Sequence, residues 1–197
     1  IVVVDRFAIG GAGSRLSIAS AGSLTSLIDV RQFAGVMTVN GTLTSRGDFL
    51  LAGGGLMGTG RINAPFTTNV LGTITGGTDT TIGTLTFGGN LVLSSGSNLF
   101  VNTGGNGVSD RIAIVAESSN AQGAATNGIA TLGGRISLAP VTGSMIRFGD
   151  LYTVLTAQGG VTGTFQAPTA LSAILQPVLI YNANSVQVRI NANSYAN

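Results

Sequence analysis

The chain has 197 residues, of which 44% are hydrophobic and only 8% are charged, so it can bury a sizeable core and does not have the composition of a disordered segment. Its net charge is +2, and the nine basic residues are arginines scattered singly along the chain, which argues against nucleic-acid binding because that function needs a clustered basic surface. Because Cys and His are absent, disulfides, Cys–His and Ser–His–Asp sites and the preferred zinc ligands are excluded.

A repeat occupies the first third of the chain. The segments 21–26, 40–45 and 59–64 align, with glycines at 22, 41 and 60, so the period is 19 residues in both steps. An apolar residue follows each glycine by two places, at Leu24, Leu43 and Ile62, and another precedes it by four places, at Ile18, Met37 and Leu56. This period is typical of one coil of a solenoid made of short strands.

Stacked coils bury columns of inward side chains that a single coil cannot bury alone. We therefore expect Leu24, Leu43 and Ile62 to lie above one another in the core, and we expect the same of Ile18, Met37 and Leu56. The glycine column is expected to mark a corner at which a positive φ is cheap.

Short alternating segments separated by glycine pairs continue to the end of the chain and predict further strands. These strands are expected at 73–75, 83–87, 90–93, 98–101, 111–115, 135–138, 152–155, 177–181 and 185–190. The segment Asn182–Asn184 reads as a hairpin loop, Glu117–Asn127 as a surface loop between coils, and Ala170–Leu175 as a single helical turn. No run of about 20 apolar residues predicts a transmembrane helix.

No catalytic, cofactor or metal site is predicted, and the chain is not expected to be an enzyme. Paired carboxylates of a glycosidase are the one catalytic arrangement that the composition leaves open. The seven acidic residues are spread along the chain with few aromatic neighbours, so we do not expect them to form such a pair.

Arg46-Gly47-Asp48 is an RGD tripeptide in an expected corner. On an exposed loop it would offer a guanidinium and a carboxylate to a receptor on a host cell or matrix, and a solvated turn is the alternative interpretation. An adhesin or receptor-binding module that uses this tripeptide, or the Glu117–Asn127 loop, is therefore a second hypothesis for function.

An ordered series of motifs runs from Gly83 to the C-terminal part of the chain. It comprises Gly83–Phe87, Gly89–Leu93, Ser95–Leu99, Ser109–Ile112, Ala130–Ile136, Tyr152–Ala157, Gly159–Phe165 and Tyr181–Val186. In order and spacing this series resembles the C-terminal, pertactin-like or autochaperone region of autotransporter passengers, which are exported by type V secretion. The loop at Glu117–Asn127 is longer than the link that usually occupies this place in the family.

The resemblance implies an all-β protein, a right-handed parallel β-helix (solenoid) with a C-terminal antiparallel cap. Residues 1–82 would form coils with the 19-residue repeat, and residues 83–197 would form the C-terminal coils and an autochaperone-like cap continuous with them. Tyr152, Phe165, Pro177 and Tyr181 are the expected sealing residues of that cap, because a terminal repeat must cover the exposed end of a solenoid.

The implied function is that of a non-catalytic stalk and folding cap of a passenger that is secreted or displayed on the surface of a Gram-negative bacterium after crossing the periplasm. Its implied partner is the passenger's own C-terminal outer-membrane β-barrel, which the resemblance does not place in this sequence. No cofactor is implied.

Overall fold

The computed structural model describes residues 1–117 and 125–193, and within these ranges the protein is all-β and contains no helix. The strands of the described residues are β1 (Val2–Val4), β2 (Phe7–Ile9), β3 (Arg15–Ile18), β4 (Ser23–Ser26), β5 (Val30–Gln32), β6 (Val36–Val39), β7 (Thr42–Ser45), β8 (Phe49–Leu51), β9 (Gly55–Gly58), β10 (Arg61–Asn69), β11 (Thr73–Gly76), β12 (Thr84–Leu93), β13 (Asn98–Thr103), β14 (Arg111–Val115), β15 (Ala130–Leu132), β16 (Arg135–Pro140), β17 (Leu151–Ala157), β18 (Val161–Gly163), β19 (Leu175–Asn182) and β20 (Ser185–Ala192). The predicted all-β class is confirmed.

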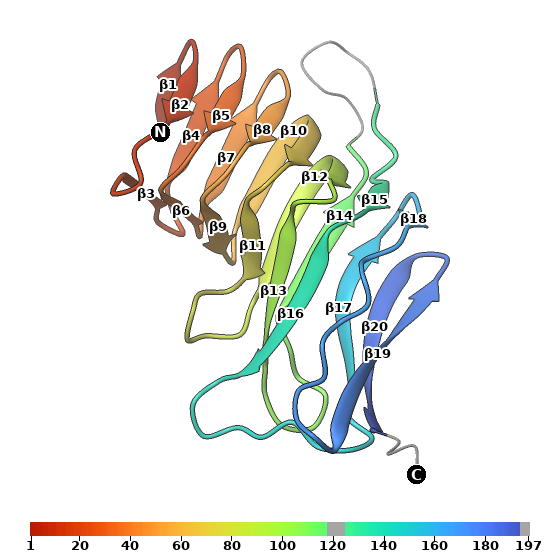
Figure 1. The fold of residues 1–197 in the computed structure, drawn as a ribbon. Coiled ribbons are helices and arrows are strands. Elements are labelled where there is room, and N and C mark those ends of the chain that lie inside the picture. Colours follow the sequence, from red (N-terminus) through yellow and green to blue (C-terminus); the bar gives the residue numbers. More distant parts are fainter. Residues whose placement is uncertain (118–124, 194–197) are drawn as a thin grey trace.

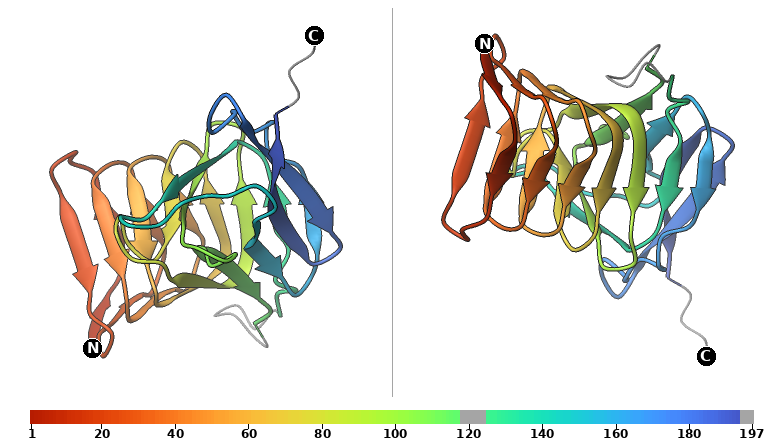
Figure 2. Two further views of the ribbon diagram at one scale, coloured as in Figure 1. Left: turned by 90° about the horizontal axis from the view of Figure 1, so that it is seen from below. Right: turned by 90° about the horizontal axis from the view of Figure 1, so that it is seen from above.

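The strands form three rows of parallel neighbours, and the coils up to β16 each contribute to all three rows (Figures 1 and 2). The first row is β1-β4-β7-β10-β12-β14-β17, and the third is the separate sheet β3-β6-β9-β11-β13-β16. The second row contains β2-β5-β8 and later β15-β18, and it joins the first because the long strands β10 and β12 belong to both. This arrangement is compatible with a β-helix or solenoid.

An aliphatic ladder runs through the interior, as the repeat predicts. Leu24 pairs in register with Leu43, and Leu43 pairs with Ile62. The same ladder continues through Phe87 and Ile114, and every side chain in it is buried. Parallel strands that pair in register therefore place each coil's apolar residues directly on those of the coil before it.

The glycine column does mark a corner, but the reason predicted for it is wrong. None of Gly22, Gly41 and Gly60 has a positive φ. A Cβ at Gly41 would instead overlap the carbonyl oxygen of Gly22, and a Cβ at Gly60 would overlap that of Gly41. Glycine is required here because successive corners pack backbone against backbone. Two glycines with positive φ, Gly35 (φ 81°) and Gly54 (φ 88°), lie at another corner and are also 19 residues apart.

The second apolar column is confirmed for one step and wrong for the other. Met37 pairs with Leu56, but Ile18 pairs with Val39 rather than with Met37. The corner that follows Ile18 spans residues 19–22, whereas the equivalent corner after Val39 contains only residues 40 and 41. The two additional residues shift the register of β3 relative to β6, and Leu16 takes the position above Met37.

The predicted strands of the C-terminal half are present with changed boundaries. The strands expected at 83–87 and 90–93 form one strand, β12, whose pairing with β10 is irregular between Asn63 and Phe66. β19 and β20 form the predicted antiparallel hairpin, with Asn182 opposite Ser185. The helical turn expected at Ala170–Leu175 is wrong, since residues 171–174 form bends and Leu175 begins β19.

Two further predictions concern how the chain is divided. Strand pairing runs without a break across the expected boundary at residues 82 and 83, because β10 pairs with β12 and β11 pairs with β13. The loop expected at Glu117–Asn127 begins and ends in an antiparallel bridge between Glu117 and Thr126, and its residues 118–124 lie outside the described part of the chain.

Candidate functional site

The C-terminal end of the strand stack is the place at which parallel pairing stops. β17 is the last parallel strand of the first row, and β20 pairs with it in the antiparallel sense. β19 then pairs with β20, so the hairpin covers the hydrogen-bonding edge that β17 would otherwise expose (Figure 1). An uncovered edge is a template for pairing with another chain.

Individual hydrogen bonds also reach the other two rows at this end. The carbonyl oxygen of Ala183, in the hairpin turn, accepts a hydrogen bond from the amide of Val161 at 2.9 Å, which reaches the second row. Asn184 Nδ2 donates to the carbonyl oxygen of Ala157 at 2.8 Å. Beyond the second row, the amide of Gln166 donates at 2.8 Å to the carbonyl oxygen of Gly134, next to the last strand of the third row.

Tyr152 is the largest fully buried side chain among the described residues and lies on β17. Its hydroxyl donates to Asp150 Oδ2 at 2.7 Å and lies 3.3 Å from the carbonyl oxygen of Gly104. Asp150 also accepts a hydrogen bond from the amide of Arg147 at 2.8 Å. Burial, followed by the adjacent Asp150 carboxylate, raises the pKa of Tyr152, so the phenol stays protonated and ties β17 to two loops.

The other expected sealing residues differ in exposure. Phe165 and Pro177 are buried, whereas Tyr181 is 37% exposed and is not a core residue. The Tyr181 hydroxyl accepts a hydrogen bond from the amide of Phe165 at 3.0 Å, and burial raises the pKa of this phenol. Tyr181 therefore fastens the segment after β18 to the hairpin from the outside rather than filling the interior.

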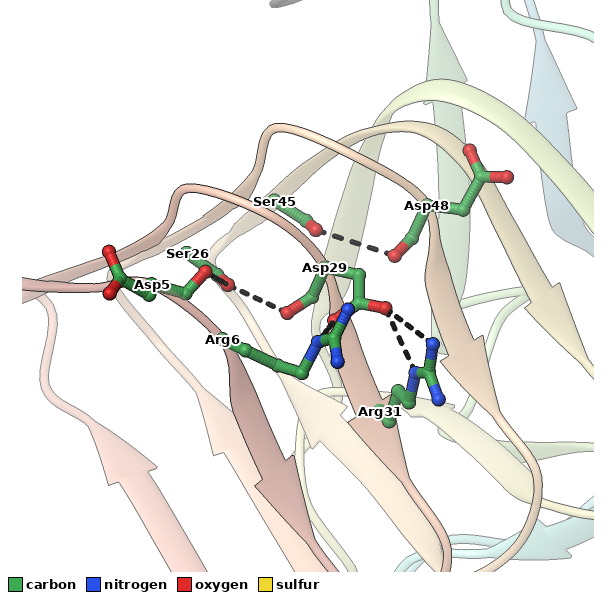
Figure 3. A network of polar contacts seen from close by, with 7 residues as sticks. All are labelled: Asp5, Arg6, Ser26, Asp29, Arg31, Ser45 and Asp48. Atoms are coloured by element: carbon green, nitrogen blue, oxygen red, sulfur yellow. Dashed lines mark hydrogen bonds and ion pairs between the residues drawn. The ribbon is translucent and has the colours of Figure 1, made fainter.

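A network of polar contacts lines the corner between the first and second rows in the N-terminal coils (Figure 3). Asp29 accepts hydrogen bonds from Arg6 Nε at 2.6 Å and from Arg31 Nε at 2.9 Å. Ser26 Oγ donates to the carbonyl oxygen of Asp29 at 2.6 Å. Ser45 Oγ makes the equivalent contact in the next coil, with the carbonyl oxygen of Asp48 at 3.4 Å.

Paired carboxylates are not expected from the sequence, but the repeat places one pair of acidic residues in adjacent coils. Asp29 and Asp48 are 19 residues apart and precede Val30 and Phe49, which pair in register, so they occupy equivalent places in adjacent coils. The two arginines on Asp29 offset the repulsion between these like charges. Arg6 and Arg31 thus hold the Asp29 carboxylate in two ion pairs at this corner.

The RGD tripeptide occupies the same corner one coil further on, between β7 and β8. Arg46 and Asp48 are exposed, and a Cβ at Gly47 would overlap the carbonyl oxygen of Ile28. The Arg46 amide donates to the carbonyl oxygen of Ser26 at 2.9 Å, so the tripeptide is held against the coil beneath it. The glycine thus has a packing role that is independent of any receptor.

Asp110 is a buried acidic residue that the sequence analysis did not single out. Its Oδ1 accepts from the amide of Gly83 at 2.9 Å, and its Oδ2 accepts from the amide of Asn102 at 2.9 Å and from Asn102 Nδ2 at 2.8 Å. Asn102 Nδ2 also donates to the carbonyl oxygen of Thr78 at 2.8 Å. The sequence could have indicated its burial, because side chains two residues apart in a strand point to the same side, and Ile112 of β14 points inward.

Burial raises the pKa of Asp110 from 3.8 to about 6, against the opposing effect of its three hydrogen-bond donors. The carboxyl group links the beginning of β12 to β13 and, through Asn102, to the loop that follows β11. Asp110 therefore holds adjacent coils together.

Comparisons with known proteins add no family to this description, since no family model matches the chain and a search of curated proteins finds no match. In the described residues, no three acidic side chains gather as they would around a metal ion. No helix with the length and apolar character needed to cross a membrane is found in those residues either. The fold thus defines the class: an all-β protein of stacked parallel strands, compatible with a β-helix or solenoid.

Proposed function

We propose that this chain is the C-terminal part of an autotransporter passenger, in which a right-handed parallel β-helix serves as a stalk and the antiparallel hairpin serves as a folding cap. The passenger would cross the periplasm of a Gram-negative bacterium and act at the cell surface or outside the cell. Its partner in secretion would be its own C-terminal outer-membrane β-barrel, and the stalk itself would be non-catalytic.

One observation carries this proposal: the row of parallel strands ends at β17, and an antiparallel hairpin covers the edge of β17. Solenoids need a terminal element that seals the last coil, because its open edge and apolar interior otherwise invite association. The right-handed sense rests on the strong preference for right-handed crossovers between parallel strands. The motif series from Gly83 onward supplies the link to secretion.

A folding role follows from the sequence separation of the contacts. The two strands of the hairpin are joined by only Ala183 and Asn184, whereas Leu24 and Leu43 must meet across a whole coil. Local contacts form faster than distant ones because closing a short loop costs less entropy. The hairpin can therefore form first and present an edge on which β17 and then the preceding coils assemble.

Deleting the hairpin, residues 175–197, should prevent refolding of the remaining chain. After dilution from denaturant, the full chain is expected to regain its β-sheet circular dichroism and protease resistance, while the deleted chain regains neither. The matched control removes one internal period, residues 42–60, which joins Gly41 to Arg61 and preserves the register of the first row. This control should refold. Equal refolding of the hairpin-deleted chain would contradict the cap function.

Receptor binding is a second candidate function, favoured by the exposure of Arg46 and Asp48 at one corner. A receptor that reads the tripeptide through its carboxylate should distinguish Asp48→Glu, which keeps the charge and moves it by one methylene group. We expect cell adhesion to surfaces coated with the variant to fall to the level of an uncoated surface if this function is correct. Equal adhesion to the parent chain and to the variant would contradict receptor binding through the tripeptide and would have no bearing on the cap function.

A further inference from the structure

The outer face of the third row contains a groove of about 390 Å³. It lies over β6, β9, β11 and β13 of the third row, whereas the RGD tripeptide lies between β7 and β8 of the other two rows, and the loop between β11 and β12 forms one side of the groove. Its volume lies within the range of about 300–1,000 Å³ that is usual for small-molecule sites. Nothing in the stalk or cap function accounts for it.

The groove arises from one residue without a side chain. On this face the outward positions of neighbouring strands pair as Val36, Gly55, Thr73 and Asn98. A Cβ at Gly55 would meet only Val36 Cγ2, at 3.8 Å, so the floor is open at this position. The parallel column two residues further along contains the larger side chains of Met57 and Phe100, which form an apolar wall.

Asn98 presents a hydrogen-bond donor to the groove. Its Oδ1 accepts a hydrogen bond from Ser137 Oγ at 2.9 Å, which occupies the oxygen and orients the amide. Among the described residues no acceptor is within hydrogen-bonding distance of its Nδ2. The amide nitrogen can therefore donate to a ligand, and the hydroxyl of Thr73 lies beside it in register.

Asp79 presents an acceptor from the opposite side. The carboxylate is exposed and makes no hydrogen bond or ion pair with the described residues. Its loop is nevertheless fixed, since the Thr78 amide donates to the carbonyl oxygen of Thr81 at 3.0 Å and Asn102 Nδ2 donates to the carbonyl oxygen of Thr78 at 2.8 Å. Such a preorganised acceptor loses little freedom when it binds a ligand.

We propose that this groove binds a neutral sugar ring. Sugar hydroxyls both donate and accept, which matches the carboxylate of Asp79 and the amide nitrogen of Asn98, and the C–H face of a sugar can pack on the ring of Phe100. Among the described residues Asp79 is the only charged residue in the lining, while Arg15 and Arg135 lie beyond the two ends of the column, beside Val36 and Asn98. A cationic ligand would face the Asn98 donor and a single aromatic ring rather than a cage.

The test is a titration of the isotope-labelled full chain with neutral disaccharides of glucose, galactose and mannose, followed by backbone amide shifts. We expect a saturable response with a millimolar Kd, confined to β9, β11, β13 and the loop at 77–83. Asp79→Asn should weaken binding roughly tenfold, because a charge-assisted hydrogen bond becomes a neutral one. Asp5→Asn, the same change at an exposed carboxylate outside the groove, should leave the Kd unchanged.

A second variant tests the donor. Asn98→Asp keeps the acceptor for Ser137 and replaces the donating nitrogen with oxygen, so it should abolish binding while the melting temperature stays near that of the parent. The proposal is overturned if no disaccharide shifts these amides, if Asp79→Asn or Asn98→Asp binds as well as the parent chain, or if the diamine putrescine shifts them and the sugars do not.

Discussion

Replacing Tyr152 with alanine is expected to lower the free energy of unfolding by about 3–5 kcal/mol, the range observed when large aromatic side chains are truncated in a core. Tyr152 has no exposed surface, and β17 carries it at the junction between the parallel coils and the hairpin. The cavity would open at the place where the two kinds of pairing meet. At about 2–4 °C per kcal/mol, the melting temperature should fall by roughly 6–20 °C.

Two other tyrosine variants separate the ring from its hydroxyl and the interior from the surface. Tyr152→Phe keeps the ring and removes the donor to Asp150, so a loss of about 1–2 kcal/mol is expected. Tyr181→Ala removes a half-exposed side chain and one hydrogen bond to Phe165, and its effect should be smaller than that of Tyr152→Ala. A larger loss of stability in Tyr181→Ala than in Tyr152→Ala would mean that packing around β17 is not the main stabilising contact of the C-terminal coil.

The position of the damage is as informative as its size. In a stack of coils each unit is stabilised by its neighbours, so the effect of a local defect should weaken with distance from it. Hydrogen exchange in Tyr152→Ala should accelerate first in β17 and in its two neighbours, β14 and β20, and last in β4 and β7. Uniform acceleration would indicate that the chain unfolds as a single unit.

The repeat alone was sufficient to predict the core of the N-terminal coils. Leu24, Leu43 and Ile62 lie in register because a slip of one residue between paired strands would turn every inward side chain outward. The 19-residue period therefore identifies the residues that pair in successive coils. The same reasoning failed at Ile18, since it assumed that every corner has the same length. Corner length varies freely at the surface, where additional backbone remains solvated.

Other features could not be predicted because they depend on contacts between distant coils. The overlap that makes Gly41 necessary involves the carbonyl oxygen of Gly22, which only the three-dimensional stack brings close. Tyr181 is aromatic and lies near the end of the chain, which suggested a sealing role, but its place in the hairpin turns it outward. The groove beside Gly55 likewise needs Asn98 from β13 and Asp79 from a loop, neither of which is marked by a motif.

Removing the carboxyl group of Asp110 is expected to cost about 3 kcal/mol or more, because three donors lose one acceptor in a buried place. In Asp110→Ala the amides of Gly83 and Asn102 lose this acceptor, and Asn102 Nδ2 keeps only its hydrogen bond to the carbonyl oxygen of Thr78. A buried donor without a partner costs about 1–3 kcal/mol. Asp110→Asn keeps one oxygen and should lie between the alanine variant and the parent. Asp5→Ala, at an exposed carboxylate, is the control and should change little.

The same carboxyl group gives the stability a dependence on pH whose sign can be worked out. Its pKa is about 6 in the folded protein and near 4 when the chain is unfolded, so the unfolded state releases its proton first. A group with a raised pKa contributes stability that is fully present below the unfolded value and is lost as the pH rises through the folded value. The contribution of Asp110 should therefore decline between about pH 4 and pH 6.

Urea unfolding of the parent and Asp110→Ala at pH 4 and pH 7 isolates this contribution, because the other titrating groups are common to both proteins. We expect the difference in free energy of unfolding between them to be larger at pH 4 than at pH 7. A difference that grows with pH would mean that the three donors at Gly83 and Asn102 outweigh burial and hold the folded pKa below its unfolded value. In either case Asp110 fastens the coil that begins at β12 to the one that follows it, and the pH profile shows in which protonation state it does so.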